Sequence, residues 1–93
     1  MTMTQEATED ILKFPCRFPV KAMGLNKNQF ADHVEQLVRQ HIEDSNDQVE
    51  VRCQLSRTER YLSVTVTLTA ISRAQMDAIY YSLTDDERVI MAI

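Results

Sequence analysis

Two histidines are the residues of this sequence whose side chains most often bind metal ions. His33 and His41 are the only histidines, and they stand eight positions apart in a segment with helical periodicity. Metal binding from one helix normally uses i, i+3 or i, i+4 spacing together with further ligands, and the sequence offers neither. We therefore expect no metal site and no cofactor. His41 instead fits the end of a helix, where the helix dipole favours a histidine.

Two cysteines are the candidate nucleophiles, and their surroundings argue against catalysis. Cys16 and Cys53 lie 37 positions apart, and neither belongs to a CxxC pair. A cysteine nucleophile needs a positioned histidine and an acid that orients it. Cys53 falls on the apolar side of an expected strand, where a thiol is usually inert. A small secreted domain would carry a denser set of cysteines. We expect two free thiols in a protein of the cell interior, and no enzymatic activity.

The composition limits the size and the partners of the protein. Its 93 residues suffice for one domain, and 14 acidic against 10 basic residues give a formal net charge of −4. This balance disfavours nucleic acid and anionic membranes as partners. The polar, acidic start is unlike a signal peptide, and no apolar stretch is long enough to cross a bilayer. We expect a cytoplasmic protein with a disordered leader over residues 1–10 and a single domain over residues 11–93.

The first half of this domain is expected to hold an arm, a strand and a helix. Two prolines favour an extended arm around residues 11–18, followed by a strand over residues 18–23. Gly24 ends this strand, since glycine can turn the chain at positive φ without steric cost. Asn26 is the expected N-cap of a helix over residues 27–42, with Gln29 in the capping-box position. The buried stripe of this helix is expected to be Phe30, Val34, Leu37, Val38 and Ile42.

The second half is expected to hold two strands, a helix and a last strand. Residues 49–56 and 62–69 alternate between apolar and polar types, which is typical of antiparallel strands with one buried face, and a short polar hairpin joins them. Ser72 and Gln75 form the capping box of a second helix, whose apolar stripe is Met76, Ile79, Tyr80 and Leu83. The last strand covers residues 88–93. The order strand, helix, strand, strand, helix, strand predicts an α+β, ferredoxin-like split βαβ fold (βαββαβ). This is a four-stranded antiparallel sheet with both helices on one face.

Three segments resemble the YbeD-like family of small uncharacterised bacterial proteins: FPCRFPVKAMG, the helix closing on VRQH, and the C-terminal RVIMAI. The most specific part is the spacing of Phe14, Pro15, Phe18, Lys21, Met23 and Gly24. The resemblance covers about residues 11–93. It implies a fold similar to the regulatory amino-acid-binding (ACT) domains, a suspected regulatory role and a suggested link to lipoate metabolism. It supplies no catalytic or binding residues.

Two surfaces are candidate sites. The last strand is apolar on both sides, and an uncovered apolar edge strand invites pairing, so Val89, Ile90, Met91 and Ile93 are candidates for self-association. Either the arm at residues 11–18 or another subunit is expected to cover this strand. By fold-level analogy, the turn at Gly24, Leu25, Asn26 and Asn28 is a candidate site for a small effector, bound by backbone donors at the helix start.

Three functions follow from these features. The first is a non-enzymatic regulatory or adaptor domain that associates with other proteins, or with itself as a homo-oligomer, through its sheet. The second is a sensor of a small-molecule effector. The third is a nucleic-acid-binding module, but Tyr61 alone offers a poor stacking platform among the polar side chains of the middle strands.

Overall fold

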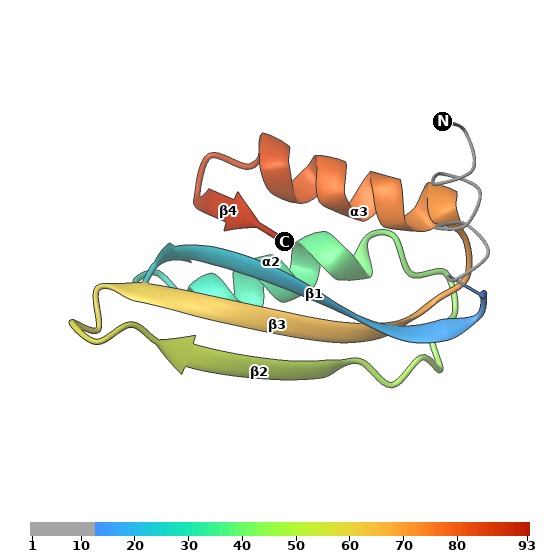
Figure 1. The fold of residues 1–93 in the computed structure, drawn as a ribbon, viewed down its shortest axis with the longest axis horizontal. Helices are drawn as coiled ribbons and strands as arrows, with labels where there is room; N and C mark the ends of the chain where they lie inside the picture. The colour runs from blue at the N-terminus through green and yellow to red at the C-terminus, as the bar shows by residue number, and fades with distance from the viewer. Residues whose placement is uncertain (1–12) are drawn as a thin grey trace, which may run out of the picture.

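The fold is an open four-stranded sheet with two helices. The computed structural model describes residues 13–93, so the predicted leader and the start of the predicted arm lie outside the described residues. Along the chain the elements are β1 (Cys16–Leu25), α2 (Phe30–Arg39), β2 (Glu50–Leu55), β3 (Tyr61–Ala70), α3 (Arg73–Asp85) and β4 (Val89–Ala92). This is the predicted order of strands and helices (Figure 1).

The sheet has the topology that the sequence predicts. Its strands lie in the order β2-β3-β1-β4, and each neighbouring pair is antiparallel. β1 and β3 pair along their full lengths, from Cys16 opposite Ala70 to Leu25 opposite Tyr61. Both helices pack on one face of the sheet, because their buried side chains join those of β1 and β3 in one core. The predicted ferredoxin-like fold is confirmed.

The core follows the alternation of the strands and the periodicity of the helices. Even-numbered residues of β1 and β3 point toward the helices, and the buried hydrophobic ones are Val20, Ala22, Val64, Val66, Leu68 and Ala70. The helices supply Phe30, Val34, Val38, Met76, Ile79 and Leu83. Leu37, Ile42 and Tyr80, which were also predicted in the stripes, are only partly buried against this cluster.

The start of α3 is set by local side chains, as predicted. The Oγ of Ser72 accepts a hydrogen bond from the backbone N–H of Gln75 at 3.1 Å. The Oε1 of Gln75 accepts in turn from the N–H of Ile71 at 2.8 Å. Because the side-chain Nε2 of Gln75 also donates to the carbonyl of His41 at 3.0 Å, the first turn of α3 is tied to the end of α2.

The predicted start of α2 is wrong. The helix covers Phe30–Arg39 rather than residues 27–42, and its N-cap is Gln29 in the left-handed region, with no side-chain capping bond. Asn28 and Gln29 have φ values of 54° and 55°, so the chain is still turning where the helix was expected to run. Asn26 does not cap the helix, because its Nδ2 donates to the carbonyl of Glu59 at 3.1 Å.

The predicted role of Gly24 is also wrong. Gly24 lies inside β1, is buried and does not have a positive φ. A Cβ at this position would lie 2.5 Å from the Cε1 and Cζ atoms of Phe30 and 2.5 Å from the carbonyl oxygen of Arg88. Glycine is needed here for close packing between β1, the start of α2 and the segment before β4, rather than for a turn.

β2 lies at an edge of the sheet that the helices do not cover. Its residues Val51, Cys53 and Leu55 pair with Val66, Val64 and Leu62 of β3, which places them on the helix-bearing face. Yet Cys53 is exposed and Leu55 is 47% exposed, and in Figure 1 β2 lies on the side of β3 away from α3. Cys53 therefore lies on the apolar side of its strand, as predicted, but the helices leave its thiol exposed on that side. Both cysteines are free, as expected.

Candidate functional site

A cavity lies beside the predicted effector turn. Its volume is about 350 Å³, and it is lined by Leu25, Lys27, Glu87, Arg88 and Ile90. These residues come from the end of β1, the following loop, the segment that leads into β4, and β4 itself. Two cations and one carboxylate therefore stand beside two apolar side chains, a combination that can hold a small molecule with an acidic group and an apolar part.

The structure brings only one of the four predicted effector residues to this cavity. Leu25 lines it, whereas Gly24 is buried beneath the ring of Phe30 and neither Asn26 nor Asn28 is among the lining residues. The backbone N–H of Asn26 donates to the carbonyl of Arg60 at 2.9 Å, so Asn26 is held toward the β2–β3 hairpin.

Arg88 organises this loop, and the sequence reasoning missed it. Its Nη2 donates to the carbonyl of Lys27 at 2.8 Å and to that of Asn28 at 2.9 Å. Its guanidinium carbon lies 5.6 Å from the centre of the Phe30 ring, within the range of a cation–π contact. No local pattern points to this role, because the two carbonyls precede Arg88 by 61 and 60 residues.

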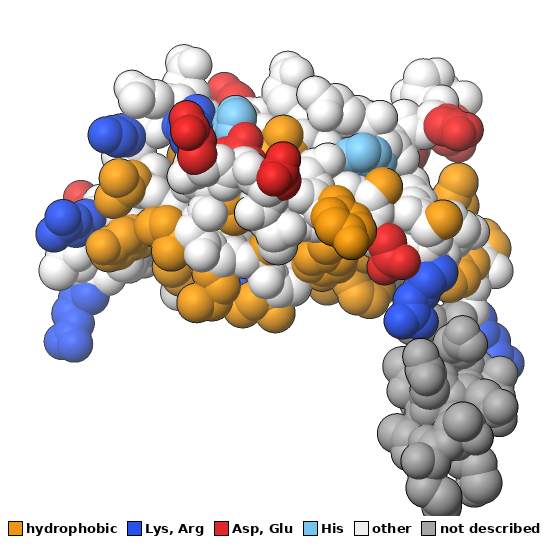
Figure 2. Space-filling view, turned by 90° about the horizontal axis from the view of Figure 1, so that it is seen from above, with side chains coloured by type: hydrophobic (Ala, Val, Ile, Leu, Met, Phe, Trp, Pro, Cys, Tyr) orange, Lys and Arg blue, Asp and Glu red, His pale blue; other side chains and the backbone are white. Residues whose placement is uncertain are grey.

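The β4 surface holds the predicted association residues. Ile90, Met91 and Ile93 are 58%, 51% and 67% exposed, whereas Val89 is half-buried and packs against the core. Met91 pairs with Met23 of β1, on the outer face of the sheet. In the view from above, hydrophobic side chains gather along the lower margin of the molecule (Figure 2).

The arm that was expected to cover β4 begins at the other end of β1. β1 starts at Cys16, so half of the predicted arm that the structure describes, residues 16–18, belongs to this strand. Phe14 packs against the core. Because β4 pairs with β1 only near Ala22 to Gly24, residues 13–15 are at the far end of β1 from this contact. Ile11 and Leu12 lie outside the described residues.

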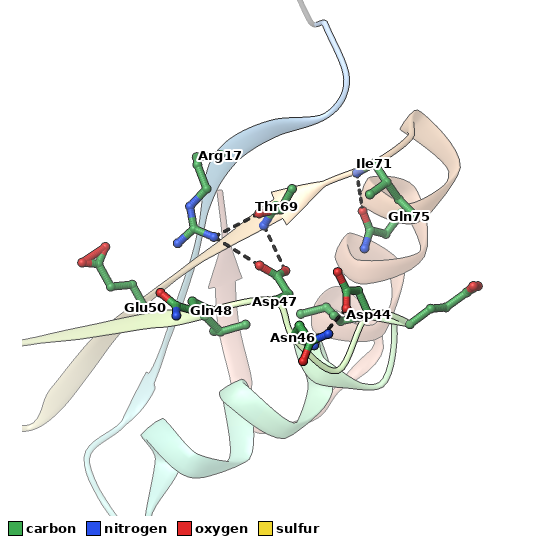
Figure 3. Close-up of a pocket in the computed structure, with 12 residues that line it drawn as sticks. Arg17, Asp44, Asn46, Asp47, Gln48, Glu50, Thr69, Ile71 and Gln75 are labelled. Atoms are coloured by element: carbon green, nitrogen blue, oxygen red, sulfur yellow. Dashed lines mark hydrogen bonds and ion pairs between the residues drawn. The ribbon is translucent and has the colours of Figure 1, made fainter.

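A larger cavity of about 650 Å³ lies at the opposite end of the sheet (Figure 3). The lining residues come from the loop between α2 and β2, the start of β1, the end of β3 and the start of α3. Exposed acidic side chains, Glu43, Asp44 and Glu50, border it. The sequence analysis did not identify this cavity.

Asp47 is the organising residue of this end, and its side chain is only 5% exposed. Its Oδ2 accepts a hydrogen bond from the N–H of Thr69 at 3.1 Å, and its Oδ1 accepts from the Nη1 of Arg17 at 3.2 Å. Arg17 also donates to the Oγ1 of Thr69 at 3.1 Å. The ladder between β2 and β3 ends at Glu50 opposite Thr67, so Asp47 supplies the acceptor that Thr69 would otherwise lack.

Both histidines join the two helices. The Nε2 of His33 lies 2.8 Å from the Oδ2 of Asp86, and the Nε2 of His41 lies 2.6 Å from the Oγ of Ser82. His41 follows the C-cap of α2, close to the predicted helix end. Residues 13–93 contain no group of three histidine, cysteine or acidic side chains arranged to hold a metal ion.

Two tyrosines are affected by their surroundings. Burial raises the pKa of Tyr80 above its ordinary value of 10.0. The guanidinium carbon of Arg60 lies 5.9 Å from the centre of the Tyr61 ring, so this ring already has a cation at one face.

Within the described part of the chain, no helix has the length and apolar character that a membrane crossing needs.

Comparisons with known proteins place the chain in a family. Residues 9–93 match a family described as protein of unknown function (DUF493). A UPF0250 protein of Chromobacterium violaceum is 39% identical over 85 residues, covering 91% of this chain and 94% of that protein. A UPF0250 protein of Nitrosomonas europaea is 38% identical over 86 residues, covering 91% and 97%.

A solved structure confirms the fold independently of sequence. The solution structure of protein HP0495 from H. pylori superposes with a TM-score of 0.70 at 11% identity, covering 88% of this chain and 85% of that one. The predicted resemblance to YbeD-like proteins is confirmed. The chain therefore belongs to the DUF493 family of bacterial proteins of unknown function.

Proposed function

We propose that this chain is a small, non-enzymatic regulatory or adaptor domain that acts by protein–protein association through its sheet. The observation that carries the proposal is the group of exposed apolar side chains on and beside β4: Leu25, Ile90, Met91 and Ile93. Single exposed apolar residues are common on any protein, whereas a group on one surface is typical of an interaction site.

The geometry indicates what kind of contact this surface makes. β4 is only four residues long, and its register with β1 shifts between Met23 and Gly24, so its free backbone offers few hydrogen bonds to a partner. The exposed apolar side chains of Met91 and Ile93 offer a partner more contact than this backbone does. We therefore expect a partner that packs an apolar surface against the outer face of β4 and β1, another subunit included.

Site-directed photo-crosslinking tests this proposal in the cell of origin. A photoreactive residue at position 91 is expected to capture a defined partner, which mass spectrometry identifies. The purified partner should then bind the wild-type chain, and Met91→Glu or Ile93→Glu should each weaken that binding about tenfold or more, because a carboxylate would be buried against an apolar surface.

Ile71 provides the matched control for these variants. It is 54% exposed and follows β3 at the opposite end of the sheet, so Ile71→Glu adds the same charge to a similarly exposed isoleucine. This variant should leave binding within about twofold. The proposal fails if position 91 captures nothing beyond what position 71 captures, or if the purified pair is indifferent to both β4 substitutions.

A second candidate function, a sensor of a small acid, is favoured by the cavity beside Leu25. Lys27 and Arg88 line it, and both can pair with a carboxylate. A panel of amino acids and lipoate-like acids should include one that shifts the amide signals of Leu25, Lys27 and Arg88 in an NMR titration. Lys27→Ala should weaken that acid about tenfold, whereas Lys21→Ala, on the outer face of β1, should not. A panel that moves none of these amides would count against the sensor.

A further inference from the structure

β2 is the less protected of the two sheet edges. It has six residues, no proline, and an unbroken register with β3. β4, by contrast, is short and has a register shift, two features by which proteins keep edge strands from pairing with other chains. No described strand lies on the outer side of β2.

The backbone of β2 presents a regular set of donors and acceptors to that open side. The N–H of Ser56 donates to the carbonyl of Tyr61 at 2.9 Å, which fixes the direction of the ladder at this end. Since backbone groups alternate along a strand, Glu50, Arg52 and Gln54 bond toward β3. The N–H and C=O groups of Val51, Cys53 and Leu55 consequently face outward.

Of the side chains of these three residues, Val51 packs partly against the core, whereas Cys53 and Leu55 are exposed. All three form the apolar row of β2 on the helix-bearing face, where Leu55 is 47% exposed and Cys53 is exposed. An occupant of this edge must therefore supply both an extended backbone and an apolar row in matching alternation. β2 itself has this pattern, so a second copy of the chain can meet both needs.

The side chains that face each other select the register of a β2–β2 pair. Side chains opposite each other must share a face, so a two-fold axis has to pass through a residue. Axes at residues 52 and 53 keep β2 opposite β2 over most of the strand, whereas axes at residues 51 and 54 overlap only its ends, and the axis at 54 also sets Val51 against Arg57. An axis at residue 52 sets Arg52 against the same arginine of the second copy. An axis at residue 51 sets Leu55 against Asp47, whose carboxylate already binds Arg17 and Thr69.

A two-fold axis at Cys53 brings neither two Arg52 side chains nor Leu55 and Asp47 face to face. It sets Val51 opposite Leu55 and Cys53 opposite Cys53 on the helix-bearing face. On the other face, Arg52 meets Gln54 and Glu50 meets Ser56, so no like charges oppose each other. All of these residues lie in β2 or directly after it.

We propose that β2 pairs antiparallel with β2 of a second copy about a two-fold axis at Cys53, which makes one continuous eight-stranded sheet. The pairing forms about six backbone hydrogen bonds between Val51, Cys53 and Leu55 of the two copies. It also doubles the apolar row and shields it between the two copies of α2. It goes beyond the role proposed for β4 and does not depend on it.

Thiol cross-linking of the full chain tests the register. A short bismaleimide should link two wild-type chains, and Cys16→Ser should leave this product unchanged while Cys53→Ser abolishes it. The matched control moves the thiol: Cys53→Ser with Thr58→Cys places it in the hairpin loop. In the proposed dimer, two residues at position 58 are about 30 Å apart, so a short reagent cannot join them. Equal yields from positions 53 and 58 would overturn the proposal.

The mass in solution supplies the second readout. Light scattering at high micromolar concentration should give twice the mass of the chain for wild type. Cys53→Lys places two ammonium groups side by side at the axis and should return the mass to that of one chain. Tyr81→Lys adds the same charge on α3, where the tyrosine is 76% exposed, and should remain a dimer. A wild-type chain of single mass would overturn the proposal, and the β4 variants described above leave both readouts unchanged.

Discussion

Gly24→Ala is expected to destabilise the fold by about 3 kcal/mol. The added Cβ would lie 2.5 Å from two ring atoms of Phe30 and from the carbonyl oxygen of Arg88. The ring belongs to a side chain that is only 2% exposed, and the oxygen belongs to the backbone that leads into β4. Neither can move away without shifting α2 or β4. Urea unfolding followed by circular dichroism measures the loss.

A double-variant cycle separates the two contacts. Phe30→Leu removes the ring atoms but leaves the carbonyl of Arg88 in place, so Gly24→Ala should cost at least about 1 kcal/mol less in that background and still cost something. If Gly24→Ala alone lowers the free energy of unfolding by less than about 1 kcal/mol, the close packing of β1 against Phe30 is wrong.

The parts of the fold that the sequence predicted well are those that local chemistry decides. The strict alternation in β3 identifies its buried face, and Ser72 with Gln75 fixes the start of α3 through hydrogen bonds within a few residues. These signals depend on neighbours in the chain, so they can be recognised before any tertiary contact is known.

The errors arise where distant residues decide. Asn26 resembles an N-cap in sequence, but Arg88 holds the carbonyls of Lys27 and Asn28 and thereby delays the start of α2. Gly24 resembles a turn residue, yet its small size is required by the ring of Phe30 and the carbonyl of Arg88. The contacts that Arg88 makes leave no local pattern in the sequence, because Arg88 lies about sixty residues further along the chain than the residues it contacts.

The same contrast between local sequence signals and distant contacts applies to the candidate sites. Apolar residues at the C-terminus predicted an association surface, and the structure exposes Ile90, Met91 and Ile93 there. The alternation of residue types in β2 predicted an apolar face, but it could not show whether a helix covers that face. In the structure Cys53 and Leu55 remain exposed on it. The open edge of β2 therefore became visible only with the positions of the helices.

Asp47→Ala is the second large effect, an expected loss of about 2 kcal/mol in the free energy of unfolding. The carboxylate is 5% exposed and gives the N–H of Thr69 its acceptor beyond the end of the β2–β3 ladder. Alanine leaves that N–H without a protein partner and frees the loop between α2 and β2 from the sheet. Urea unfolding measures the loss, and hydrogen exchange should show the Thr69 amide less protected.

Asp47→Asn distinguishes the backbone contact from the ion pair. An asparagine keeps an oxygen that can accept from Thr69, but its NH2 group replaces the oxygen that accepts from Arg17, so the variant removes both the charge and the hydrogen bond that face Arg17, whose side chain is 47% exposed. Because Arg17 is about half exposed, solvent screens its charge in this pair, so Asp47→Asn should cost about 1 kcal/mol or less. The nearby Asp44→Ala, which removes an acceptor for the N–H of Asn46 in the exposed loop, serves as the control and should cost less than Asp47→Ala. Equal costs for Asp47→Asn and Asp47→Ala would instead show that the pair with Arg17, and not the amide of Thr69, holds this end of the sheet together.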